Sequence, residues 1–255
     1  KYEEALTWYE KALAGFVDEG EEKMTAATYN NMASVYDDQG EYTKALAFYD
    51  KSLAINLKVF GPDHPSTART YGNMASVYKT DGEYTQALAF HEKCLAIQLK
   101  TLGPDHPDTA GTYGNMASVF SGQGEYTKAL AFYDKALHIE LKTLGPEHPS
   151  TTSTYNNMAG VYYHQGEYTQ ALAFYDKTLV IDLKTLGPDH PSTATTYSGM
   201  ATVYSKQGEY TRALAFYDKS LAIRLKTLGP NNPSTATTYG NMASLYSQQG
   251  EYTKA

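Results

Sequence analysis

Apolar residues recur along this chain at intervals of three and four positions, which is the spacing of one face of an α-helix. Between Ser66 and Thr80 this face is made by Tyr71, Met74, Ala75 and Tyr78. A glycine follows the stretch and suits the left-handed conformation in which many helices end. The pattern therefore predicts a helix that buries a stripe of tyrosine, methionine and alanine.

A second helical pattern runs from Glu83 to Leu102. Tyr84, Ala87, Leu88 and His91 begin a series spaced i, i+3, i+4, i+7 on one face. The Gly-Pro pair after it ends the helix, because glycine suits the cap and proline cannot continue the hydrogen bonding. No stretch predicts a strand, so the expected fold class is all-α.

Both helices return at a fixed period of 42 residues, the distance from Gly40 to Gly82. A period between about 20 and 50 residues indicates stacked repeats, in which each unit contacts only its neighbours. With 42% hydrophobic residues the chain has enough apolar surface for such a continuous core. The glycines that mark the period are Gly40, Gly82, Gly124, Gly166, Gly208 and Gly250.

The period divides the chain into one solenoid over residues 1–255. The chain begins and ends inside a repeat, so we expect it to be a piece of a longer array, with uncapped ends through which it would self-associate. The predicted parts are a partial repeat over 1–23, helix pairs over 24–65, 66–107, 108–149, 150–191 and 192–233, and a truncated repeat over 234–255.

Charge and cysteine content exclude several classes of protein. The net charge is −7 and no lysine or arginine run occurs, so nucleic-acid binding is not expected. No apolar run reaches the roughly 18 residues of a membrane span, so we expect no membrane insertion. The single cysteine, Cys94, occupies a slot that other copies fill with Ser, Thr or Ala, which indicates helix packing. A reducing compartment, and hence a cytoplasmic location, is the expectation.

Four histidines stand in the turns between repeats. One histidine per separate turn cannot assemble a zinc site, so we interpret them as structural, with Asp63 or Ser66 capping the helix that follows. His91 replaces a core tyrosine and is interpreted as a packed residue. The periodic histidines are His64, His106, His148 and His190.

Nothing in the sequence predicts an active site. Acid–lysine neighbours such as Asp50 and Lys51 are interpreted as solvated faces. No nucleophile has a fixed histidine and acid partner, and no glycine-rich phosphate loop follows a strand. We therefore expect no catalytic residue, no metal, no cofactor and no enzymatic activity.

The repeat resembles the tetratricopeptide repeat (TPR), and its 42-residue length is similar to the repeats of kinesin light chain and nephrocystin-type proteins. The resemblance implies a right-handed superhelical solenoid of antiparallel helix pairs, and a protein–protein interaction scaffold. Small residues let the helices approach, and aromatic residues fill the space between them. In one copy the matching residues are Tyr113, Met116, Ala117, Phe120, Ala129, Tyr133 and Ala136.

In this family the first helix of each pair lines a concave groove, where related repeats use asparagine to hold peptides. An asparagine amide both donates and accepts, so it can pair with the backbone of an extended peptide. Alternatively, each asparagine bonds a neighbouring helix or an interior water. The candidate peptide-binding residues, one before and two after each methionine, are Asn31, Asn73, Asn115, Asn157 and Asn241, with Ser34, Ser76, Ser118, Thr202 and Ser244.

Tyr163 and His164 are the bulky departures in this row and would mark a pocket. The expected function is the binding of peptide segments or partner helices in the groove. Two alternatives stay open at this point. The array is an architectural spacer in a large assembly, or it is the sensor arm of a larger multidomain protein.

Overall fold

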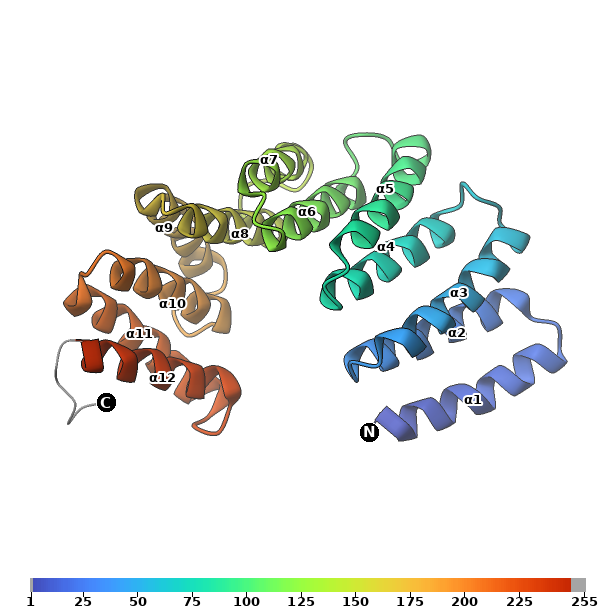
Figure 1. Cartoon of the computed structure of the whole chain (residues 1–255), viewed down its shortest axis with the longest axis horizontal. Coiled ribbons are helices and arrows are strands. Elements are labelled where there is room, and N and C mark those ends of the chain that lie inside the picture. The colour runs from blue at the N-terminus through green and yellow to red at the C-terminus, as the bar shows by residue number, and fades with distance from the viewer. Residues whose placement is uncertain (1, 249–255) are drawn as a thin grey trace. The chain divides into compact units, whose positions relative to one another are not determined.

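The computed structural model describes residues 2–248, and this part of the chain consists of helices without any strand (Figure 1). The prediction of an all-α helical-repeat fold is confirmed. The helices are α1 (Tyr2–Asp18), α2 (Glu22–Asp38), α3 (Tyr42–Val59), α4 (Pro65–Thr80), α5 (Tyr84–Thr101), α6 (Pro107–Gly122), α7 (Tyr126–Thr143), α8 (Pro149–Gln165), α9 (Tyr168–Thr185), α10 (Pro191–Lys206), α11 (Tyr210–Leu228) and α12 (Pro233–Gln248).

The chain divides into two compact units, one running to Ile139 and one beginning at Glu140. In the first unit α2 packs on α3, α3 on α4, and α4 on α5. In the second unit α8 packs on α9, α9 on α10, and α10 on α11, so within each unit these helices contact the next one in sequence. That residues 1–255 form one continuous solenoid stays a prediction.

The larger core clusters join one helix pair to the first helix of the next. In the first unit Ala33 and Ala45 are fully buried and let α2 and α3 approach closely. Tyr49 fills the space beside them, and Met74 and Val77 of α4 close the cluster. Small residues thus allow close approach of the helices and an aromatic residue fills the space between them, as the sequence predicted.

The turn histidines cap the helices that follow them. The His148 Nδ1 atom accepts a hydrogen bond from the Ser150 backbone N–H at 3.2 Å. His64, not Asp63 or Ser66, caps α4, so that detail of the prediction was wrong, while the structural role of the histidines is confirmed. The Asn232 side-chain oxygen makes the same bond at 2.9 Å, which explains why asparagine can replace histidine in the last turn.

We expect His148→Ala to lower the free energy of unfolding by about 1 kcal/mol, the usual cost of a lost N-cap. His148→Asn should leave it nearly unchanged, because Asn232 caps its helix in the same way. Urea unfolding followed by circular dichroism measures both. Equal losses of unfolding free energy in the two variants would show that the hydrogen bond to the Ser150 N–H contributes nothing to stability.

The lysines of the second helices are exposed, as the sequence predicted, and they also contact aromatic rings. The Lys51 ammonium lies 4.7 Å from the ring centre of Phe48 and 5.4 Å from that of Tyr29. Such cation–π contacts join the two helices of a pair. The same contact is made by Lys93, Lys135, Lys177 and Lys219.

Candidate functional site

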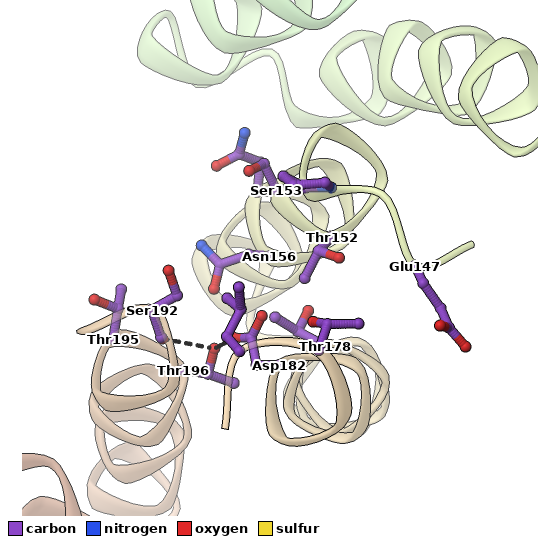
Figure 2. A pocket seen from close by; sticks show the side chains of 13 residues that line it. Glu147, Thr152, Ser153, Asn156, Thr178, Asp182, Ser192, Thr195 and Thr196 are labelled. Carbon is purple, nitrogen blue, oxygen red and sulfur yellow. Dashed lines mark hydrogen bonds between the residues drawn. The ribbon is translucent and has the colours of Figure 1, made fainter. Parts of the chain in front are cut away.

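A pocket of about 370 Å³ lies between α8, α9 and α10 of the second unit (Figure 2). Its rim carries exposed polar residues, among them Ser153, Asn157 and Thr195. Its floor is formed by buried residues, among them Thr178 and Asp182. The pocket thus combines an accessible polar mouth with a deeply placed carboxylate.

Asp182 is the most unusual group of the pocket, because its side chain is ionisable and only 2% exposed. The Thr196 hydroxyl donates a hydrogen bond to Asp182 Oδ2 at 3.1 Å, as Figure 2 shows. Burial raises the pKa of Asp182, and the Thr196 bond and the nearby His190 offset only part of that effect. The folded structure therefore places this carboxylate where its ionised form is disfavoured.

The Asp182 position recurs in every helix pair with a different side chain, and the sequence reading missed it. Its partner is always the threonine fourteen residues later, whose hydroxyl accepts from some side chains and donates to others. The signal in the sequence was limited to one variable polar position fourteen residues before an invariant threonine. The pairs are Asn56–Thr70, Gln98–Thr112, Glu140–Thr154, Asp182–Thr196 and Arg224–Thr238.

The predicted asparagines divide into two groups. Asn157 lines the pocket, and Asn31 and Asn115 are likewise exposed. Asn73 instead donates to the Asn30 side-chain oxygen at 3.2 Å, and Asn241 bonds the Tyr217 hydroxyl. The first group has the accessible amides that the groove hypothesis needs, whereas the second group bonds neighbouring helices, the alternative raised above.

The predicted hydroxyl residues also divide. Thr202 Oγ1 lies 2.9 Å from the hydroxyl of the buried Tyr217. Ser34 bonds Tyr49, whose pKa is raised to about 12 by burial and the nearby Asp37, so this phenol stays protonated at neutral pH. Ser118 bonds Tyr133 in the same way, and it also accepts from Lys79 at 2.6 Å. Ser76 and Ser244 are exposed.

Tyr163 and His164 are not among the residues that line this pocket. Tyr163 packs against the cluster around Tyr175, with its ring centre 6.1 Å from that of Tyr168. His164 is exposed and its ring lies 5.2 Å from that of Tyr163. The bulky pair therefore covers part of the core beside α9.

Cys94 is buried against the helix core, which confirms its packing role. Over residues 2–248 no three His, Cys, Asp or Glu side chains gather as metal ligands would. None of the described helices is both long and apolar enough to cross a membrane.

The sequence profile of the tetratricopeptide repeat family matches residues 24–100, 70–142, 108–159, 150–226 and 192–255. These overlapping matches cover most of the chain. No curated protein matches it.

Solved structures that resemble the chain include the following three. One is a Podosopora anserina protein described as a candidate kinesin light chain with nearly identical TPR-like repeats; it has 26% identity and a TM-score of 0.67, covering 79% of this chain and 96% of that chain. BtubC (BKLC) from P. vanneervenii has 21% identity and a TM-score of 0.74, covering 91% and 93%. Aspartyl phosphate phosphatase F from Bacillus subtilis has 14% identity and a TM-score of 0.72, covering 93% and 70%. The last two support the fold alone. The profile matches show that this chain belongs to the tetratricopeptide repeat family.

Proposed function

We propose that this chain is a protein–protein interaction scaffold that binds peptide segments or partner helices on the surface formed by its first helices. Repeats of this family are generally interaction modules, which sets the class of function. The observation that carries the proposal is the polar pocket between α8, α9 and α10, because Asn157 of the predicted row stands at its rim.

The accessible asparagines supply the recognition chemistry. Asn31, Asn115 and Asn157 are exposed, and each amide can accept from one peptide N–H while donating to a peptide carbonyl. A partner in extended conformation presents such groups at regular intervals. Several equivalent contacts along the array would add through avidity, so no single contact has to be strong.

A peptide-display screen tests the proposal with the parent chain and with a double variant, Asn115→Asp and Asn157→Asp. The variant keeps the side-chain size but replaces both donors with acceptors and adds charge. We expect peptides selected on the parent to bind the variant about tenfold more weakly, or worse, since each hydrogen bond to a buried peptide group contributes about 1 kcal/mol.

Gln86→Glu and Gln170→Glu form the matched control, because they add the same charge at exposed positions of the second helices. The control should bind like the parent, and circular dichroism should show equal helicity in all three proteins. Peptides that bind parent and double variant equally, or a screen that yields no peptide, would contradict the proposal and favour an architectural role.

A further inference from the structure

The pocket in the second unit contains a buried acid without a cation beside it. Among the described residues no lysine or arginine forms an ion pair with Asp182, whose polar contact is the Thr196 hydroxyl. The pocket's other acid, Glu147, is already paired with Lys184 on the exposed side. His190 caps α10 with its Nδ1 atom. The negative charge at the floor is therefore left to be compensated from outside.

An ionised carboxylate out of water is unfavourable unless a hydrogen bond and an opposite charge accompany it. Thr196 supplies one hydrogen bond, and the raised pKa of Asp182 shows that burial is not fully offset. A cation that entered the pocket would recover this cost, so the free pocket has a built-in preference for positive ligands.

The pocket is large enough to hold one long side chain. A volume of about 370 Å³ lies at the lower end of the range of about 300–1,000 Å³ that ligand sites show. Figure 2 shows Ser153 and Asn156 on one side of the Asp182–Thr196 pair and Thr195 on another. Their oxygen atoms can accept hydrogen bonds from an ammonium or guanidinium group on its way to the carboxylate.

We propose that this pocket receives a lysine or arginine side chain of a bound peptide and pairs its cation with Asp182. The inference rests on the proposed function and specifies the chemistry of the partner. It also assigns the variable position a purpose, since Asn56, Gln98 and Arg224 would give their repeats neutral or opposite preferences.

Residues at the equivalent position of other repeats indicate which substitutions of Asp182 can be tested. Asp182→Asn places at this position the residue that bonds Thr70 in the first unit, and Asp182→Arg places there the residue that bonds Thr238. Both should fold with normal helicity. Asp176→Asn is the matched control, because it removes the same charge from an exposed position of α9 outside this pocket.

The probe is a displayed library of random twelve-residue peptides, selected on the parent chain. We expect lysine or arginine to be enriched at one peptide position. Replacing it by norleucine or citrulline should weaken binding to the parent about 10- to 100-fold, as for other buried charge pairs. Asp182→Asn should lose the same factor and respond little to the peptide change. Asp182→Arg should select acidic residues at that position, and Asp176→Asn should behave like the parent.

Two outcomes would overturn the inference in different ways. Peptides that bind the parent without any cationic preference, and bind Asp182→Asn equally well, would remove the assigned partner chemistry and leave the scaffold function standing. A library that yields no ligand for the parent would remove the proposed function, and the inference with it.

Discussion

Gly199→Ala is expected to lower the free energy of unfolding of the second unit by about 2 kcal/mol, within the usual range for overpacking a core. Gly199 lies in α10, and a Cβ atom there would stand 2.5 Å from the Tyr175 ring. Tyr175 is buried against Ala159, Ala171 and Met200, so the ring cannot simply swing away. Gly160→Ala is the matched control, since a Cβ atom there meets nothing within 4 Å.

The control should gain about 0.5–1 kcal/mol, because alanine is the better helix former. Urea unfolding followed by circular dichroism compares the two variants. A Tyr175→Leu background provides a second check, because it removes the ring atoms that approach Gly199, and there Gly199→Ala should no longer destabilise. If Gly199→Ala and Gly160→Ala have the same effect in the parent, the close approach carries no energetic weight.

His91→Tyr is expected to stabilise the first unit by about 2 kcal/mol at neutral pH. His91 is only 1% exposed, and neither of its ring nitrogens has a hydrogen-bond partner, a situation that costs about 1–3 kcal/mol. The other copies carry tyrosine here, and Tyr49 and Tyr133 bond the serine of the preceding helix. A tyrosine at position 91 would find the equivalent Ser76.

The same substitution should change how stability depends on pH. Burial, with a smaller effect of Lys79, lowers the pKa of His91 to about 4, whereas an unfolded histidine titrates near 6.5. Between these values the unfolded chain binds a proton that the folded chain excludes. The stability linked to His91 is therefore fully present above pH 6.5 and is lost as the pH falls towards 4. The loss is about 3 kcal/mol, at about 1.4 kcal/mol per pH unit.

Urea unfolding at pH 7, 5 and 4 measures this effect. The His91→Tyr protein should lose about 3 kcal/mol less than the parent over this interval. His138→Tyr is the control, because that histidine is exposed on α7, and its curve should follow the parent. Parallel curves for parent and His91→Tyr would show that His91 does not carry the acid sensitivity.

The helices could be predicted from the sequence because 3.6-residue periodicity and glycine stops are local properties. The expected helix at Ser66–Thr80 is observed as Pro65–Thr80. Contacts between helices were harder to predict from the sequence, since they depend on which residues meet after packing. For this reason the exposed position of Lys51 could be predicted, but its cation–π contact with Phe48 could not.

The candidate site was predicted in part for the same reason. The rows beside each methionine could be located by helix geometry, and Asn157 does stand at the pocket. Whether an amide is accessible depends on the neighbouring helix, so Asn73 turned out to bond Asn30. Asp182 was missed because its pairing with Thr196 spans two helices and is not visible as a linear motif.

The invariant threonine opposite the variable position has a consequence for how such arrays diversify. A hydroxyl rotates to suit its partner, so one receptor group tolerates amide, carboxylate and guanidinium side chains without rebuilding the stack. Duplicated or shuffled copies would then inherit the same architecture and differ by a single codon in what they recognise. A modular array whose copies are reordered should keep its fold while its pattern of charge preferences is rewritten.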